Sequence, residues 1–338
     1  LRNQIDRTYD ARMDFGLADL QTPGPGKGWP NPPDVDTRGY LVSMQGAKRN
    51  SAPTAQTGSA YASGSAGSPP DLTTWRSGRR TEFAEWQQQH SNRELWDAPE
   101  APRMVVVPPG SFVMGAPQGE PGRWKWEGPP HRVNIGYAYA VGKYPVTFNE
   151  WDACVADGGC KGYTPYDEHW GRSNHPVINV SWDDAQAYVA WLSRKTGHRY
   201  RLLSEAEYEY AERAGSAAPY STGESISLRD ANFLDPDHPA PGAQGKTPMP
   251  VGSFPPNPFG LYDMQGNVWV WVQDCWHDDY GGKAPVDGSA WLTGDCQRRV
   301  VRAGSFNRDR SFMRSAARYW IVGQLRSALA GFRVARDL

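Results

Sequence analysis

The stretch 301-VRAGSFNRDRSFMRSAARYW-320, with 259-FGLYDMQGNVWVWVQDCW-276 before it, is the part of the chain that decides the expected fold. Both segments mix short apolar runs with glycine, asparagine and aspartate, which favour turns and loops. Residues 260–338 are therefore predicted to form short strands, turns and long loops instead of long helices.

Regular elements are predicted upstream of these segments. The run 103-RMVVVPPGSFVMG-115 indicates two short strands around a Pro-Gly turn. Capping signals then predict three helices. The first helix opens at Thr147 with Glu150 and runs through Val155. The second opens at Ser181 and ends at Gly197. The third opens at Ser204 with Glu207 and ends at Gly215. The predicted fold class is α+β with little regular secondary structure.

Composition changes near residue 100 and divides the chain in two. Residues 1–100 include 22-TPGPGKGWPNPPD-34 and the low-complexity segment 51-SAPTAQTGSAYASGSAGSPPD-71. One short helix is predicted around 81–96. Such a segment is ordered only where something holds it, so we expect an extended N-terminal arm that contacts its own domain or a partner protein. Residues 101–338 are predicted to form the folded domain.

Bulk properties exclude several classes of function. The 338 residues carry a formal net charge of −1, which gives no indication of nucleic acid as a partner. No run of about 18 apolar residues occurs, so no transmembrane segment is predicted. Neither a P-loop nor a G-x-S-x-G nucleophile elbow is present. The chain starts at Leu1, which leaves open whether a signal peptide or an anchor precedes it.

The four cysteines indicate two disulfides. None of them forms a C-x-x-C pair, which disfavours zinc. The predicted bonds are Cys154–Cys160 within one short loop and Cys275–Cys296 across a longer one. Such bonds are typical of an oxidising compartment, and hence of a periplasmic or secreted protein. The alternative is four ordinary buried thiols in a cytosolic protein.

Seven blocks, taken together and in order, resemble the sulfatase-modifying-factor family, which comprises the formylglycine-generating enzymes and their relatives. The blocks are 110-GSFVMG-115, 144-YPVTFNEWDACVADGGC-160, 175-HPVINVSWDDAQAYVAWLS-193, 201-RLLSEAEYEYAERAG-215, 259-FGLYDMQGNVWVWVQDCW-276, 301-VRAGSF-306 and 331-GFRVAR-336. The resemblance implies the family's variant of the C-type lectin fold. It does not imply one activity, because a fold hosts many functions.

The family's redox metals are disfavoured by the residues present. Its oxidases hold Cu(I) with two cysteines after a Gly-Gly-Ser turn, and the resemblance places these positions at about Arg308 and Met313. Cu(I) prefers thiolates, so formylglycine formation is not expected and no catalytic residue is assigned. Iron is disfavoured as well, because the His-x3-His-x-Glu helix of the family's sulfoxide synthases is absent from residues 1–130. The turn itself has Ala303 where the family has glycine, which matters if φ is positive there.

Calcium is a candidate cofactor that the resemblance implies only weakly. The family often binds it through the turn that matches 263-DMQGNVWV-270, but Val270 stands where the family has a glutamate. A hard cation needs several oxygen ligands. The candidate ligands are Asp263, Gly266 and Val268, with Asn232 matching part of a second family site.

The groove of the family is expected to lie on a surface rich in arginine and aromatic residues, which is typical of binding hot spots. The candidate groove residues are Trp269, Ser305, Asn307, Arg308, Arg310, Met313, Arg314, Arg318, Tyr319 and Trp320. The alternative is that the arginines pin loops by binding carbonyl groups that an irregular fold leaves unpaired.

These observations favour a non-catalytic, extracytoplasmic binding or assembly subunit whose residues 1–100 contact a partner protein. Two alternatives stay open. One is a divergent oxidative enzyme, in the manner of the pyoverdine-maturation members of the family. The other is a lectin-like receptor whose C-terminal face binds varied ligands.

Overall fold

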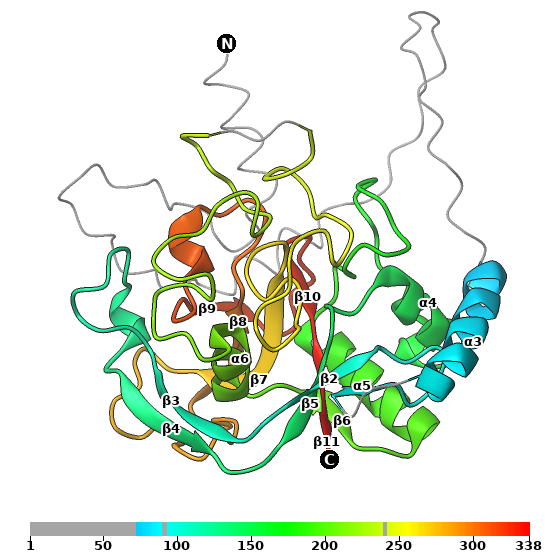
Figure 1. Cartoon of the computed structure of the whole chain (residues 1–338), viewed down its shortest axis with the longest axis horizontal. Helices are drawn as coiled ribbons and strands as arrows, with labels where there is room; N and C mark the ends of the chain where they lie inside the picture. Colours follow the sequence, from blue (N-terminus) through cyan, green and yellow to red (C-terminus); the bar gives the residue numbers. More distant parts are fainter. Residues whose placement is uncertain (1–71, 90–92, 239–241) are drawn as a thin grey trace, which may run out of the picture. The chain divides into compact units, whose positions relative to one another are not determined.

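The computed structural model describes residues 72–89, 93–238 and 242–338 (Figure 1). The chain divides into two units, Leu1–Ser68 and Pro69–Leu338. Residues 1–71, which hold most of the expected arm, lie outside the described residues. Within the described ranges, no helix is long and apolar enough to cross a bilayer.

Three small sheets form the β part of the described chain. The five-stranded sheet has the order β1-β2-β5-β11-β6, the four-stranded sheet β10-β7-β8-β9, and the third pairs β3 with β4. Neighbouring strands run antiparallel except β10 and β7, which are parallel. The strands are β1 (Glu94–Leu95), β2 (Met104–Val107), β3 (Gly110–Met114), β4 (His131–Ile135), β5 (Tyr139–Gly142), β6 (Tyr200–Leu202), β7 (Trp269–Trp276), β8 (Asp295–Arg302), β9 (Tyr319–Val322), β10 (Ala330–Phe332) and β11 (Val334–Asp337).

Within the described residues, the helices precede β7 in the chain, apart from one 3₁₀ turn in the C-terminal part. The α-helices are α3 (Leu72–Gln89), α4 (Phe148–Ala156), α5 (Trp182–Thr196) and α6 (Glu205–Arg213), and the 3₁₀ turns are η1 (Lys125–Glu127), η2 (Cys160–Gly162) and η3 (Arg310–Met313). This mixture confirms the α+β class with little regular structure.

The capping predictions are confirmed in detail. The side chains of Thr147, Ser181 and Ser204 each accept a hydrogen bond from the backbone N–H three residues on, and each helix start is a full capping box. Helix α5 ends at Gly197, which has a left-handed φ of +76°. Helix α6 ends one residue before its predicted stop, because Ala214 already has φ +44°.

The two strands predicted within 103–115 exist as β2 and β3, but they do not pair with each other. Strand β2 pairs with β5 in the five-stranded sheet, whereas β3 pairs with β4 in the two-stranded sheet. The Pro-Gly turn thus connects a strand of the five-stranded sheet with a strand of the two-stranded sheet. Sequence spacing does not distinguish this arrangement from a hairpin.

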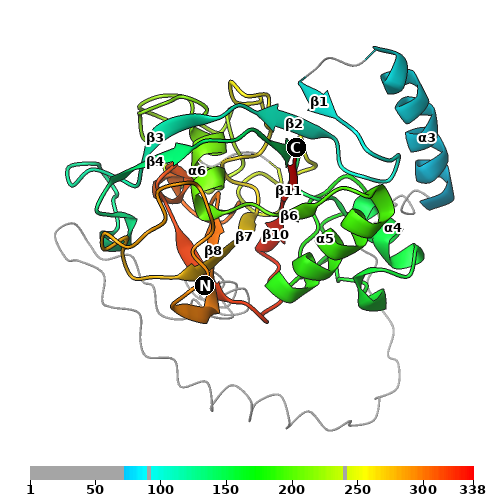
Figure 2. The ribbon, with the colours of Figure 1, turned by 90° about the horizontal axis from the view of Figure 1, so that it is seen from below.

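Residues 72–89 and 93–100 pack on the folded domain. Helix α3 begins at Leu72, not near residue 81, and the segment after it contributes β1 to the five-stranded sheet. The guanidinium of Arg79 lies 4.4 Å from the ring centroid of Trp96 and donates hydrogen bonds to the carbonyls of Pro99 (2.9 Å) and Ala101 (2.7 Å). Arg76 reaches the carbonyl of Ala153 in α4, and α3 lies beside α4 (Figure 2).

The main hydrophobic core lies where α6 packs against β3, β7 and β8. Tyr208 of α6, Val270 of β7 and Val300 of β8 are all completely buried in it. The hydroxyl of Tyr208 donates to the carbonyl of Met264 over 2.9 Å. Helix α6 is therefore held against the strands that lead to the candidate site.

Candidate functional site

The turn that follows β8 has a left-handed backbone at two consecutive residues. Ala303 has φ +81° and Gly304 has φ +71°. The carbonyl of Ala303 accepts a 2.7 Å hydrogen bond from the backbone N–H of Gly266, which holds the turn on the 263–268 loop. Glycine adopts this conformation freely, whereas a side chain with a Cβ is strained by about 1–2 kcal/mol. The methyl group at 303 therefore stands at a position that favours glycine.

A buried network of ion pairs connects β8 with α6. Nη2 of Arg302 lies 2.7 Å from Oε2 of Glu209, and Nη1 lies 3.3 Å from Oε1 of Glu205. Arg318 binds the same Glu205 through Nε at 2.6 Å and Nη2 at 2.8 Å. Glu205 and Glu209 lie one helical turn apart on α6, so both carboxylates face the two arginines.

Burial and these charges shift the pKa values of the carboxyl groups. Burial raises the pKa of Glu209, but the guanidiniums of Arg213 and Arg302 outweigh it and hold the pKa below its usual range. Burial, with a smaller effect of Glu205, raises the pKa of Asp274 to about 7. Shifted pKa values occur in active sites and also in structural ion-pair networks. Both side chains of the Arg302–Glu209 pair are fully excluded from solvent, so their charges are neutralised by groups of the fold itself.

A second buried pair fixes the loop that contains η1. Nη1 and Nη2 of Arg314 each lie 2.7 Å from one carboxylate oxygen of Glu127. Nη1 also binds Glu120 at 2.8 Å, and Nη2 donates to the carbonyl of Gly122 at 2.6 Å. Arg314 and Arg318 thus bind carboxylates and carbonyls of the protein itself. This agrees with the interpretation that these arginines fix loops.

Exposure narrows the candidate groove. Side chains without access to solvent contact an external ligand only after a rearrangement of the fold. Among the candidates, Trp269, Ser305, Met313, Arg314, Arg318 and Tyr319 are buried, Asn307, Arg308 and Trp320 are half-buried, and Arg310 is exposed. The accessible part of the predicted groove is therefore residues 307–310 and Trp320.

A row of ring contacts links the two accessible parts through the interior. The guanidinium of Arg308 lies 5.8 Å from the centroid of Phe312. Phe312 packs edge-on against Trp269 at 5.9 Å, and Trp269 contacts Tyr319 at 6.0 Å. Tyr319 stacks on Trp320 at 5.9 Å. The buried rings of Trp269 and Tyr319 thus connect Phe312, next to Arg308, with the half-buried Trp320.

Three rings of this region were not among the candidates predicted from the sequence. Phe312 lies within the stretch quoted first, but Trp124 and Trp126 are almost two hundred residues earlier in the chain. Trp124 stacks on Trp126 at 5.1 Å and contacts Phe312 at 5.4 Å. The indole N–H of Trp126 donates to the carbonyl of Arg318. The tryptophan pair in 124-WKW-126 gave no spacing signal that connects it with residues 307–320.

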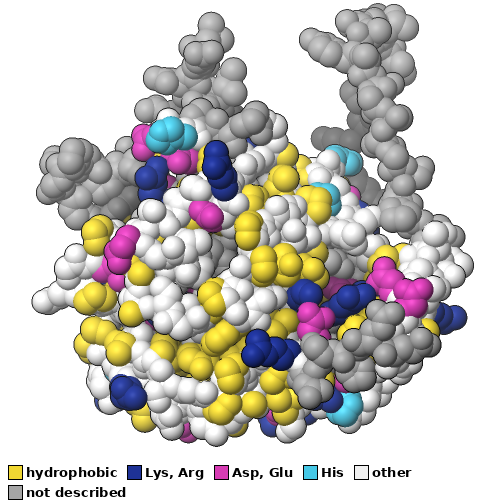
Figure 3. All heavy atoms as spheres, in the orientation of Figure 1, with side chains coloured by type: hydrophobic (Ala, Val, Ile, Leu, Met, Phe, Trp, Pro, Cys, Tyr) yellow, Lys and Arg dark blue, Asp and Glu magenta, His cyan; other side chains and the backbone are white. Residues whose placement is uncertain are grey.

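The charges at the exposed end are mixed. Nη2 of Arg310 lies 3.0 Å from the largely buried Asp235 and 3.6 Å from the exposed Asp237. The face seen in Figure 3 likewise has its acidic and basic side chains in small mixed groups. The accessible surface therefore offers hydrogen-bonding and ring contacts to a ligand without a strong field of one sign.

The positions of the oxidase cysteines hold no thiol. Met313 is completely buried. Its Cε lies only 2.2 Å from the position that a Cβ on Gly304 would occupy. The guanidinium of Arg308 lies over the Phe312 ring. Both predicted disulfides are confirmed, Cys154–Cys160 and Cys275–Cys296, and they use all four cysteines of the chain.

The expected calcium ligands lie near one another but differ in availability. Oδ2 of Asp263 accepts a 2.8 Å hydrogen bond from the N–H of Gly252, whereas the buried Oδ1 has no hydrogen-bond partner among the described residues. A parallel bridge joins Gly266 to Asn232. Val268 is buried in the same turn. Asp263 is therefore the one side chain of the four with a carboxylate oxygen to offer.

Asn232 does not fit the role of a calcium ligand in this arrangement. Its Oδ1 accepts the N–H of Gly245 at 2.8 Å, and its Nδ2 donates to the carbonyl of Thr247 and to Asn267. In the part of the chain that the structure covers, no three His, Cys, Asp or Glu side chains gather in a metal-binding group. A cation at this turn would depend on Asp263 and on backbone carbonyls.

The fold and the site together define a C-type lectin-like domain that carries the sequence blocks of sulfatase-modifying factors without the oxidase thiols. Residues 91–338 match the family model of the sulfatase-modifying factor enzyme 1-like domain. The chain belongs to this family.

Relatives of several kinds share this domain. The formylglycine-generating enzyme of Thermomonospora curvata is 29% identical over 295 residues, which cover 69% of this chain and 93% of that protein. The serine/threonine-protein kinase pkn1 of Chlamydia pneumoniae is 30% identical over 255 residues, 70% of this chain but only 38% of the kinase. The structure of PvdO from Pseudomonas aeruginosa superposes with a TM-score of 0.66 at 40% identity and covers 72% of this chain and 98% of PvdO.

Proposed function

We propose that this chain is a non-catalytic binding or assembly subunit of the family that works outside the cytoplasm. The observation that carries the proposal is the replacement of the two oxidase cysteines by Arg308 and Met313, with no free thiol elsewhere in the chain. A thiolate pair is what Cu(I) requires. The chain thus keeps the fold of the family but lacks the two thiols that the copper-dependent oxidation of a cysteine requires.

The accessible part of the candidate groove supports a binding role. Arg308 lies over Phe312, which packs on the buried Trp269, and Arg310 is two residues further along the same loop. This combination of guanidinium and aromatic groups is typical of binding hot spots. Arg310 keeps about half of its side chain exposed even though it pairs with Asp235. We propose residues 307–310, Phe312 and Trp320 as the contact surface.

The extracytoplasmic location and the role of the arm belong to the same proposal. Two disulfides favour an oxidising compartment, that is, the periplasm or the outside of the cell. Residues 72–89 and 93–100 pack on the domain, so a contact of the arm with a partner protein would come from residues 1–71. Their Pro, Gly and Ser content is typical of segments that become ordered on binding.

Native mass spectrometry of the protein from its own source, with metal analysis of the same sample, tests the proposal. We expect a heteromeric assembly without stoichiometric copper or iron. A monomer that carries one copper or iron per chain contradicts it and favours a divergent oxidative enzyme. Hydrogen exchange on the same assembly should show protection within residues 1–71 that is absent from the free chain.

A pair of substitutions tests the surface. Arg310→Ala should weaken the assembly, because it removes a half-exposed guanidinium from the proposed contact. Arg199→Ala is the matched control, since Arg199 is 77% exposed and pairs with Asp337 at 2.9 Å outside this surface. Equal assembly of both variants and the wild type would remove Arg310 from the proposal.

Calcium at the 263–268 turn is proposed as a ligand that stabilises the fold. The unpartnered Oδ1 of Asp263 supports it, and the valine at 270 limits the expected affinity. The midpoint of thermal unfolding should rise with calcium relative to a chelator, and Asp263→Ala should abolish the rise. Asp279→Ala, at an exposed position, should leave it unchanged. A wild-type midpoint that does not respond to calcium contradicts the site.

A further inference from the structure

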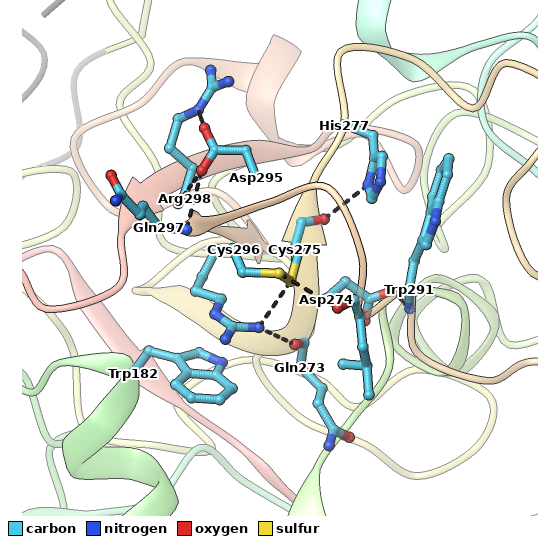
Figure 4. Close-up of a disulfide and its surroundings, with 12 residues drawn as sticks. Trp182, Gln273, Asp274, Cys275, His277, Trp291, Asp295, Cys296, Gln297 and Arg298 are labelled. Carbon is cyan, nitrogen blue, oxygen red and sulfur yellow. Dashed lines mark hydrogen bonds and ion pairs between the residues drawn. A yellow bond between two sulfur atoms is a disulfide. The ribbon is translucent and has the colours of Figure 1, made fainter.

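The disulfide between β7 and β8 is strongly asymmetric (Figure 4). Cys275 lies inside β7 and is 1% exposed, whereas Cys296 lies near the start of β8 and is partly exposed. The sulfur of Cys296 is close to the surface, 3.5 Å from the carbonyl oxygen of Leu292. A reagent from solvent therefore reaches one sulfur of the bond and not the other.

An arginine is bound to the buried sulfur. Nη1 of Arg299 donates to Sγ of Cys275 at 3.2 Å and to the carbonyl of Gln273 at 3.0 Å. Its guanidinium lies 3.8 Å from the ring centroid of Trp182, whose indole N–H is itself fixed on the carbonyl of Val272 at 2.8 Å. The Arg299 guanidinium thus contacts both the Trp182 ring and the sulfur of Cys275.

We propose that Cys275–Cys296 is a thiol–disulfide exchange site of fixed polarity, which reacts with dithiol reductants. A thiolate of the reductant attacks Sγ of Cys296; the S–S bond breaks, and Cys275 leaves as a thiolate paired with the Arg299 guanidinium. The second thiol of the reductant, after losing its proton, attacks the reductant's own sulfur in the mixed disulfide. The reductant is oxidised to its disulfide, and Cys296 leaves as a thiolate that takes up a proton.

Each feature of the site favours this polarity. Exchange depends on which sulfur is accessible and on how well the leaving thiolate is stabilised. A neighbouring arginine stabilises a thiolate. Of the two sulfurs of the bond, Arg299 donates its hydrogen bond to that of Cys275. Access and charge therefore select the same direction: attack on Cys296 and departure of Cys275.

The surrounding loop is held by contacts that do not involve the disulfide. The N–H of Trp291 donates to Asp274 at 2.7 Å, and its carbonyl accepts the N–H of Cys275 at 2.9 Å. The Trp291 ring stacks on His277 at 3.4 Å. The reduced sulfurs therefore stay near each other, and the bond is expected to re-form when an oxidant of the disulfide class is supplied.

The second disulfide of the chain is an internal control. Cys154 is 0% exposed and Cys160 is 3% exposed. Neither sulfur of Cys154–Cys160 is accessible in the folded protein. The same sample thus reports the reactivity of an accessible, arginine-bound bond and of a buried one.

The experiment treats the folded full-length chain with dithiothreitol, quenches by alkylation and maps the labelled cysteines by mass spectrometry. We expect Cys275 and Cys296 to be labelled at least roughly tenfold faster than Cys154 and Cys160. With glutathione, a monothiol, the adduct should form on Cys296. Equal labelling of the two disulfides, or a glutathione adduct on Cys275, would overturn the proposal without reference to any variant.

Matched substitutions test the arginine. Arg299→Gln should slow the release of Cys275 by roughly three- to tenfold, because the leaving thiolate loses its cation. Arg298→Gln removes the same charge from the neighbouring residue, whose guanidinium binds Asp295 at 2.6 Å and lies over Trp320, away from the sulfur. It should react within about twofold of the wild type. Identical rates for the two variants contradict the role of Arg299.

Discussion

Arg302 and Glu209 form an ion pair of 2.7 Å in which both side chains are fully excluded from solvent. The pair ties the end of β8 to the middle of α6, and it supports the turn on which the family builds its site. Two charges taken out of water are costly, and they are stable because they neutralise each other and have Glu205 and Arg213 as further partners.

Glu209→Gln should therefore destabilise the protein strongly. The substitution leaves Arg302 buried with one carboxylate less, and breaking a buried pair in this way costs about 3–5 kcal/mol. Equilibrium unfolding in urea measures the free energy. Glu82→Gln is the control: Glu82 pairs with Arg103 at 3.3 Å with about half of its surface exposed, and its loss should cost below about 1 kcal/mol. Equal costs would contradict the importance of burial.

The left-handed turn predicts an unusual response to glycine. Ala303→Gly loses a buried methyl group and adds chain entropy, but it relieves a strain of about 1–2 kcal/mol at φ +81°. The variant should unfold at nearly the wild-type urea concentration. Ala317→Gly, at a position that is equally buried but has no positive φ, should lose about 1–2 kcal/mol. Similar losses at both positions would show that residue 303 is not strained.

Asp274 should make the stability depend on pH. Its pKa is raised to about 7 in the folded protein, first by burial and then by Glu205, against about 3.9 in an unfolded chain. Between these values the folded state binds the extra proton, so the free energy of unfolding should fall as the pH rises from about 4 to about 7.

Asp274→Asn should remove this part of the pH dependence, about 2–4 kcal/mol across the interval. Urea unfolding at several pH values, with a chelator present, measures it. The exposed Asp279→Asn variant is the control and should keep the wild-type slope. An unchanged slope in Asp274→Asn would assign the pH dependence to other groups.

Arg79 should be necessary for the docking of α3. Its guanidinium contacts Trp96 and two carbonyls, so Arg79→Ala removes both ring and hydrogen-bond contacts. Limited proteolysis should then cut within residues 72–89 several-fold faster than in the wild type. Arg80→Ala changes an exposed position on the same helix and should leave the cleavage rate unchanged. Equal cleavage of the two variants would contradict the anchoring role.

Local rules explain which elements could be predicted. The capping boxes at Thr147 and Ser204 depend on residues three positions apart, and the glycine after α5 depends on its own backbone. Helix α3 begins at Leu72 instead of near residue 81, and its Arg79 contacts Trp96 and the loop that follows, which apolar periodicity within 81–96 does not encode.

The candidate site was predictable only in part. The order of the blocks located the turn around Ala303 and the absence of thiols at 308 and 313. It did not separate Arg310, which is exposed, from Arg314, which is buried on Glu127 at a distance of 187 residues in the chain. Trp124, which stacks on Trp126, contacts Phe312 across a similar separation.

The sequence by itself determined the family, the α+β class, the starts of α4, α5 and α6 and both disulfide pairs, because these follow from short-range chemistry and from the order of the blocks. Only the tertiary structure decided which arginines pin loops and which stay accessible. It also decided that β2 and β3 enter different sheets and that Arg299 binds one sulfur of a half-exposed disulfide. Burial and charge pairing depend on segments that are distant in the chain, and no local pattern encodes which of them meet.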